Sequence, residues 1–220
     1  MKPFIATLLA VWFLAVFFLG ANGAFVMPPD KPPFPILIGV LAPLAVFILA
    51  YVGSSAFRAF ILSVDPVLLS SIQGWRAAGL GFLSLAAHGV LPWLFAWPAG
   101  LGDIAIGVTA PWVVQALVRR PAFVTSPIFK VWNLLGILDL VNAVSMGALN
   151  SGFIPGVVGH VTTAPVAQLP LVLIPGFLVP FFIMLHLSAL FQARRHSSAP
   201  SKIFAEGFHH QETMATKERA

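Results

Sequence analysis

Cysteine is absent from this chain of 220 residues, and charged residues make up only 9% of it. Without cysteine the chain forms no disulfide, thiolate metal site or iron–sulfur cluster, and it offers no attachment point for a c-type haem. Soluble domains carry about 25% charged residues, so the shortage of charge excludes an ordinary soluble fold. The 12 lysines and arginines stand singly or in pairs, which argues against nucleic-acid binding.

Apolar residues are abundant instead: they make up 59% of the chain, and the mean hydropathy is +0.94. A membrane-spanning helix needs about 20 mostly apolar residues, and six stretches qualify. The sequence therefore predicts an all-α integral membrane protein, a six-transmembrane-helix bundle that crosses the cell membrane and has the lipid bilayer as its first partner. The expected spans are Phe4–Gly20, Pro35–Val52, Ala77–Trp97, Leu101–Val118, Val131–Leu149 and Leu169–Ala193.

The connections between these spans carry turn and helix-breaking residues. Trp97-Pro98-Ala99-Gly100 is expected to form a tight hairpin between the third and fourth helices. The break Gly53–Trp75 has room for a helical turn at the interface. Four prolines recur every five residues from Pro165 to Pro180, so the sixth helix is expected to be kinked or broken in its outer half.

Orientation follows from the basic residues, because cytoplasmic loops retain positive charge during insertion. Placing both termini in the cytoplasm puts every lysine and arginine except Lys31 on the cytoplasmic side, Arg76 among them. Residues 1–193 then form the membrane domain and residues 194–220 a disordered cytoplasmic tail. Cleavage of residues 1–23 as a signal peptide is an alternative, which would leave five spans in the same orientation.

Four ionisable residues interrupt the apolar spans: His88, Asp103, Asp139 and His186. Such side chains are costly in hydrocarbon, and they usually face the bundle interior and mark a pathway or ligand site. Asn142 follows Asp139 by three positions and is expected on the same helix face. Asp139 and His186 lie at depths that differ by only about 3 Å, so we expect them to form a pair. Asp103 is expected in the first turn of its helix, where a carboxylate caps the helix dipole.

Gly100-Leu101-Gly102-Asp103-Ile104 resembles the Gly-x-Gly-Asp motif of presenilin-like and signal-peptide-peptidase-like intramembrane aspartyl proteases and of prepilin peptidases. This resemblance implies that Asp103 would be one of two catalytic aspartates. The preceding helix lacks the Tyr-Asp motif expected in the first two groups, and Asp139 is about 7 Å from Asp103 in expected depth. A second alternative is a b-type haem between His88 and His186, which would make the chain an electron-transfer protein.

The leading hypothesis is a small-solute or ion transporter, or a permease-like protein, without enzymatic activity. Its protonatable polar core would comprise His88, Asp103, Asp139, Asn142 and His186. No metal site and no cofactor are predicted beyond the haem alternative. The competing hypothesis is a non-enzymatic scaffold or assembly subunit in which the same residues only hold helices together, as a homo-oligomer or within a membrane complex.

Overall fold

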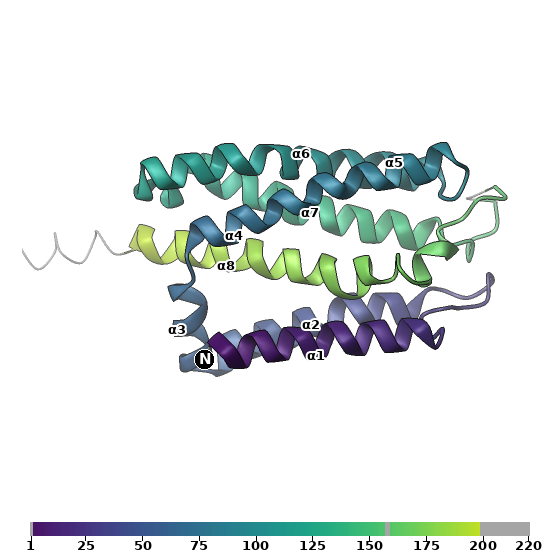
Figure 1. Ribbon diagram of the computed structural model, residues 1–220, viewed down its shortest axis with the longest axis horizontal. Coiled ribbons are helices and arrows are strands. Elements are labelled where there is room, and N and C mark those ends of the chain that lie inside the picture. Colours follow the sequence, from purple (N-terminus) through teal and green to yellow (C-terminus); the bar gives the residue numbers. More distant parts are fainter. Residues whose placement is uncertain (1, 157–158, 199–220) are drawn as a thin grey trace, which may run out of the picture.

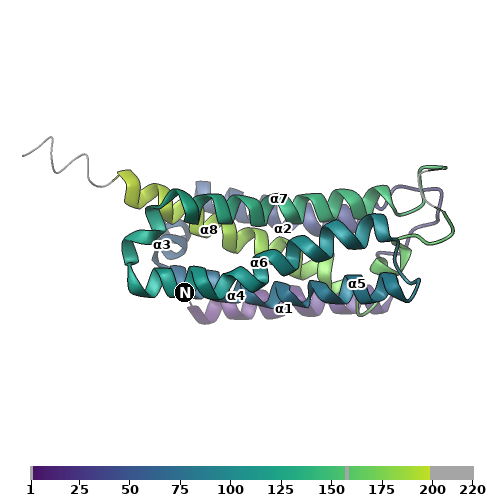
Figure 2. The ribbon, with the colours of Figure 1, turned by 90° about the horizontal axis from the view of Figure 1, so that it is seen from above.

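The computed structural model describes residues 2–156 and 159–198, which form an elongated bundle of helices with the connections at its two ends (Figures 1 and 2). Short 3₁₀ segments (η1, η2, η3) and one π-helical segment (η4) extend or connect the α-helices. The elements are α1 Lys2–Ala21, α2 Phe34–Gly53, α3 Ser55–Ser63, α4 Pro66–Ile72, η1 Gln73–Gly79, α5 Leu80–Ala87, α6 Trp93–Arg119, η2 Pro121–Thr125, α7 Pro127–Leu149, η3 Ala164–Ala167, η4 Ile174–Leu178 and α8 Val179–Ser198.

Five helices in the described residues are long and apolar enough to cross a membrane. These are Pro3–Ala21, Phe34–Gly53, Trp93–Arg119, Pro127–Leu149 and Ile174–Arg195. The segments Ser55–Ser63 and Pro66–Ala87 meet at a bend of 77° and together form a sixth candidate. The predicted all-helical fold is therefore confirmed, with five to six helices of membrane-spanning length where six were expected, and these apolar helices indicate a membrane protein.

The boundary between the third and fourth spans differs from the prediction. The third rod runs from Pro66 to Ala87 rather than from Ala77 to Trp97, and α6 passes straight through the expected hairpin at residues 97–100. The turn lies at residues 88–92, where Gly89 has a φ of +70° and its N–H donates to the Ala86 carbonyl. A glycine with positive φ is a common end for a helix, whereas a helix with other helices around it accommodates Pro98.

The break after α2 contains a short helix, α3, in the region where a helical turn was expected, and then the start of the third rod. The Asp65 carboxylate accepts a hydrogen bond from the Val67 N–H at 2.8 Å, and Pro66 occupies the first helical position. An acidic cap followed by proline is a strong helix start. The third rod therefore begins at Pro66 rather than at Ala77, where the apolar run begins.

The last span is irregular at its beginning, as its prolines predicted. Residues 164–172 form 3₁₀ and other turns, η4 is a π-helical segment, and the α-helix α8 begins at Val179. The α8 helix continues to Ser198, so the expected tail boundary at residue 194 falls within a helix. The rest of the predicted tail, residues 199–220, lies outside the described residues.

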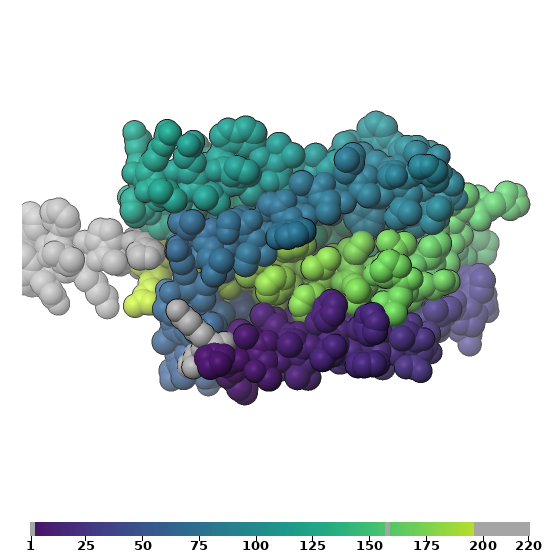
Figure 3. Space-filling model, in the orientation of Figure 1, coloured from purple at the N-terminus to yellow at the C-terminus, as the bar shows by residue number. Residues whose placement is uncertain are grey.

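The third rod, α6, α7 and α8 pack together as the polar-centred part of the bundle, and α2 and α1 lie along the α8 side of it (Figures 1 and 3). Helix α1 packs chiefly on η4, where Trp12 and Phe13 contact the ring of Phe177. The N-terminus and the end of α8 lie at the same end of the bundle (Figure 1).

The closest helix contact joins η1 to α6. A Cβ on Gly107 would overlap the backbone of Ala77, and one on Gly100 would lie 3.0 Å from the Gly79 carbonyl oxygen. Glycine therefore allows the two backbones to touch. Because the two backbones are so close, side chains of η1 lie in the centre of the bundle.

Candidate functional site

Arg76 lies halfway along the third rod, in η1, and its side chain is completely buried. Its Nε donates to Asp103 Oδ1 at 2.7 Å, and its Nη2 donates to Asp139 Oδ2. Its Nη1 donates to the Gly136 carbonyl at 3.2 Å and lies 3.1 Å from His186 Nε2. One guanidinium on the third rod thus joins groups on α6, α7 and α8.

The proton on His186 can be assigned from these partners. A guanidinium only donates, so Nε2 of His186 must accept from Arg76. The ring proton then lies on Nδ1, which donates to Asn133 Oδ1 at 2.8 Å, and the Asn133 amide in turn donates to the Phe129 carbonyl at 2.8 Å. The ring of Trp132 contacts the His186 ring edge-on at 5.5 Å between centroids. Each polar atom of the His186 ring therefore has a defined partner.

Three glycines make the room that this cluster needs. A Cβ on Gly102 would overlap the Asp139 carboxylate, and one on Gly136 would overlap the His186 ring. A Cβ on Gly79 would overlap the side chain of Asp103. The Gly-x-Gly-Asp sequence thus serves packing here: its second glycine receives the carboxylate of a neighbouring helix.

Charge in the cluster is unequal, since two carboxylates face one guanidinium. Charged groups away from water are costly unless they are paired, and Arg76 supplies a partner for both carboxylates. The Asp103 and Asp139 side chains retain 15% and 13% exposure, whereas Arg76 has none. The carboxylates are therefore the only members of this ion-paired group that remain partly exposed.

Three of the five sequence-predicted residues meet at Arg76: Asp103, Asp139 and His186. Asp103 lies in the middle of α6 rather than in its first turn, because the helix begins at Trp93. Asp139 and His186 both contact Arg76, and no direct hydrogen bond joins them among the described contacts, so the expected pair is a triad with arginine at its centre.

His88 and Asn142 lie outside the cluster. His88 ends α5, is exposed, and its Nδ1 is 2.8 Å from the Ser84 carbonyl, so it lies at the end of the third rod rather than inside a span as predicted. Asn142 is exposed on α7 and points away from the interior, although Asp139 precedes it by three positions. A step of three residues leaves about 60° between side chains, enough here to separate an inner face from an outer one.

Sequence reasoning missed Arg76 and Asn133. Arg76 was predicted in a cytoplasmic loop because it precedes the apolar run that begins at Ala77. The available signal was Asp65-Pro66 followed by Val67-Leu68-Leu69, which marks a helix start ten residues earlier. A helix that begins there carries Arg76 to its midpoint.

The structure also argues against the two alternative functions, haem binding and aspartyl proteolysis. His88 and His186 lie at different levels of the bundle, so the predicted haem pair is wrong. The predicted depth gap between Asp103 and Asp139 is wrong as well, because both bind one guanidinium. That guanidinium joins them in place of the shared proton of a protease dyad. Within the described residues no group of three His, Asp or Glu side chains is arranged to hold a metal ion.

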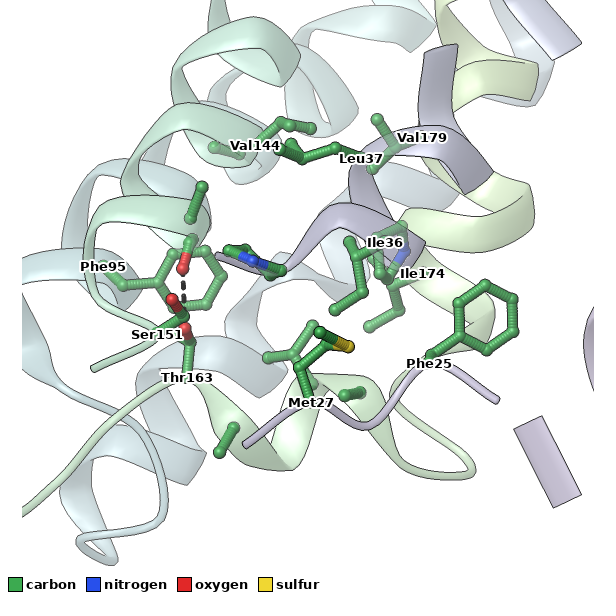
Figure 4. Close-up of a pocket in the computed structure, with 18 of the residues that line it drawn as sticks. Phe25, Met27, Ile36, Leu37, Phe95, Val144, Ser151, Thr163, Ile174 and Val179 are labelled. Atoms are coloured by element: carbon green, nitrogen blue, oxygen red, sulfur yellow. Dashed lines mark hydrogen bonds between the residues drawn. The ribbon is translucent and has the colours of Figure 1, made fainter. Parts of the chain in front are cut away.

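A pocket of about 110 Å³ lies between the cluster and the end of the bundle that carries the α1–α2 and α7–α8 connections. Figure 4 shows Met27, Ser151 and Thr163 at one side of it and Val144, Leu37 and Val179 at the other. Most of its lining is apolar. Its charged lining residues within the described chain are Lys31, from the α1–α2 connection, and Asp103, from the cluster.

Comparison with known proteins identifies a family without assigning an activity. The family model described as a domain of unknown function (DUF8737) matches residues 33–194, a range that begins just before α2 and includes every residue of the cluster. No curated protein and no solved structure matches the chain. Because the match covers well over half of the sequence, the chain belongs to the DUF8737 family.

Proposed function

We propose that this protein is a multi-pass protein of the cell membrane that transports a small solute or ion, and that a proton or small cation binds at Asp103. The proposal rests on one observation: Asp103 is paired with Arg76 and also lines the pocket. The charged cluster is thereby continuous with a space that leads toward one end of the bundle. A purely structural ion pair does not need such a space.

The chemistry follows from the surplus of negative charge. A proton or cation that reaches Asp103 through the pocket competes with Arg76 for the carboxylate. Arg76 keeps Asp139, the Gly136 carbonyl and His186 as partners while it releases Asp103. The guanidinium therefore keeps three partners when a proton or cation occupies Asp103, and has all four when Asp103 is free. Transport proteins use paired ionisable residues of this kind at mid-membrane.

Orientation is part of the proposal, with both termini in the cytoplasm. The basic residues in the described part of the chain support it: apart from Arg76 and Lys31 they lie at the bundle end that also holds the N-terminus, whereas Lys31 lies at the other end (Figure 1). Arg76 no longer counts toward the bias, because it is inside the bundle. The residues at the proposed cytoplasmic end are Arg58, Arg119, Arg120, Lys130, Arg194 and Arg195.

Proton flux into proteoliposomes tests the transport proposal. Purified protein is reconstituted with a pH-sensitive dye inside the vesicles, and a potassium gradient with valinomycin sets the membrane potential. We expect flux above that of empty vesicles for the wild type and loss of that flux for Asp103→Asn. The matched control is Asp65→Asn, since asparagine also caps a helix and Asp65 lies outside the cluster.

Two results would contradict the proposal. One is a wild-type flux no greater than that of empty vesicles. The other is equal flux in Asp103→Asn and wild type. Either result, combined with a lowered melting temperature for Asp139→Ala, favours the scaffold function, in which Arg76 and its partners only hold the helices together.

Thiol labelling of intact cells tests the orientation separately. The chain has no cysteine, so Ala122→Cys and His160→Cys each introduce a single thiol at an exposed connection, one at either end of the bundle. A membrane-impermeant reagent is expected to label His160→Cys in intact cells and Ala122→Cys only after permeabilisation. The reverse pattern would overturn the orientation.

A further inference from the structure

Asn142 differs from every other asparagine in the chain. The side chains of Asn22, Asn133 and Asn150 each donate to the carbonyl four residues earlier, at 2.7 to 2.8 Å. The Asn142 amide has no hydrogen-bond partner among residues 2–156 and 159–198, and it is exposed on the outer face of α7. It lies about 10 Å before the end of the helix at Leu149, within the length expected to be in hydrocarbon.

The exposed residues around Asn142 follow a heptad pattern. They are spaced alternately by four and three residues along α7, and all of them are exposed: Val131, Leu135, Leu138, Asn142, Ser145 and Leu149. A repeat averaging 3.5 residues keeps one stripe of a helix in continuous contact with a partner helix in a left-handed pair. The apolar members are large side chains rather than the small residues of the glycine-rich contacts inside the bundle.

We infer that this stripe is the interface of a parallel homodimer in which Asn142 of one copy hydrogen-bonds Asn142 of the other. An amide carries both a donor and an acceptor, so two copies related by a twofold axis along the membrane normal complement each other. Copies inserted in the same orientation bring their α7 helices together in parallel and in register. A single asparagine at the core position of such a stripe also selects the dimer over other arrangements.

A lipid-facing position explains Leu135 and Leu138 equally well, but not Asn142. Lipid chains have no group to pair with an amide, which is costly to leave unpaired in hydrocarbon. The remaining alternative is a different protein that offers a polar group at that depth. The self-complementary amide on a regular heptad stripe favours a second copy of this chain, and cross-linking distinguishes the two.

Disulfide cross-linking in native membranes tests the dimer directly. Because the chain is free of cysteine, Leu138→Cys introduces one thiol in the stripe, and Leu41→Cys introduces one of similar exposure on α2 (63% and 60%). Oxidation is expected to give a cross-linked dimer from Leu138→Cys and none from Leu41→Cys. Equal cross-linking of both, no cross-linking of Leu138→Cys, or a product containing another protein would overturn the inference.

The contribution of the amide is measured by diluting labelled protein in liposomes and counting subunits per particle. Asn142→Leu is expected to weaken dimerisation by about tenfold, and Asn142→Gln to preserve it. The melting temperature of the monomer in detergent should be unchanged in Asn142→Leu, since the side chain is exposed and makes no hydrogen bond within the described residues. Particles that stay monomeric at every dilution of the wild type would also overturn the proposal.

Discussion

The bundle has two parts that are held together differently. The peripheral half consists of α1 and α2, and the second half consists of the third rod, α6, α7 and the last span. In α1 and α2 only 11% of the residues of each apolar window are buried, and neither helix has an acidic or basic side chain beyond Lys2. In the last span half of the residues are buried, and His186 and Gln192 make hydrogen bonds to other helices. Lipid replaces protein contacts for an apolar helix at little cost, whereas it cannot replace the partners of a charge. Stability and specificity should therefore concentrate in the second half.

The largest effect is expected for Arg76→Leu. Removing the guanidinium leaves Asp103 and Asp139 close together without a counter-charge, and such a change costs about 3–5 kcal/mol of unfolding free energy. Thermal unfolding followed by size-exclusion chromatography in detergent measures the loss. The control Arg58→Leu removes an exposed side chain that caps α2 through the Tyr51 and Val52 carbonyls, and should cost about 1 kcal/mol or less. Similar losses in the two variants would refute the special role of the cluster.

A smaller but still clear effect is expected for Gly102→Ala. The added methyl group would overlap the Asp139 carboxylate, and overpacking of this kind costs about 1–3 kcal/mol. Gly81→Ala is the matched control, because Gly81 is in α5 with nothing within 4 Å of a Cβ. That control should be neutral or stabilising by up to about 1 kcal/mol, since alanine favours helix. The sign of the difference in melting temperature decides the test.

Asn133→Leu should have a more modest effect, about 1–3 kcal/mol, because the His186 Nδ1–H loses its acceptor while remaining buried. The matched substitution Asn150→Leu removes a side chain that bonds only its own helix. Unfolding free energies of both variants and the wild type provide the comparison. A loss for Asn150→Leu as large as that for Asn133→Leu would show that the link to His186 adds nothing.

The smallest effect is expected in the peripheral half, for Trp12→Ala. Trp12 packs against Phe177 with ring centroids 4.6 Å apart, yet lipid or detergent can cover the exposed ring face after the substitution. The expected loss of unfolding free energy is about 0.5–1 kcal/mol, which is the contribution of an aromatic pair. No hydrophobic contribution is added, because lipid is as apolar as the contact that it replaces. A melting temperature lowered as much as in Arg76→Leu would remove the distinction between the two halves.

Much of the fold could be predicted from hydropathy, because the spans around α1, α2 and α7 are long apolar runs whose ends match the helices to within a few residues. The third span could not, because its first half carries Gln73 and Arg76 and is not apolar enough to be recognised. The sequence contains both the helix start at Asp65-Pro66 and the turn at Gly89, but competing signals at Ala77 and Pro98 outweighed them in the prediction.

The candidate site was predicted in part for a related reason. An isolated aspartate or histidine in an apolar run is conspicuous, so Asp103, Asp139 and His186 were identified individually. Their common partner, Arg76, was not identified. In the sequence, an arginine next to a loop cannot be told apart from the basic residues that set membrane orientation. The outward direction of Asn142 depends on which side of α7 the other helices occupy, and the repeat of that helix alone does not determine it.

The position of Arg76 also has a consequence for biogenesis. The ribosome completes the third rod before α6, α7 and α8 exist, so the arginine enters the translocon without any of its partners. An arginine at the centre of a helix costs about 2.5–3.5 kcal/mol in translocon-mediated insertion. The rod is therefore expected to wait at the interface, held by α3, until Asp103 arrives on α6 and the two segments can enter the bilayer as a neutralised hairpin. Insertion of the third rod and its first contact with α6 are then expected to be one event.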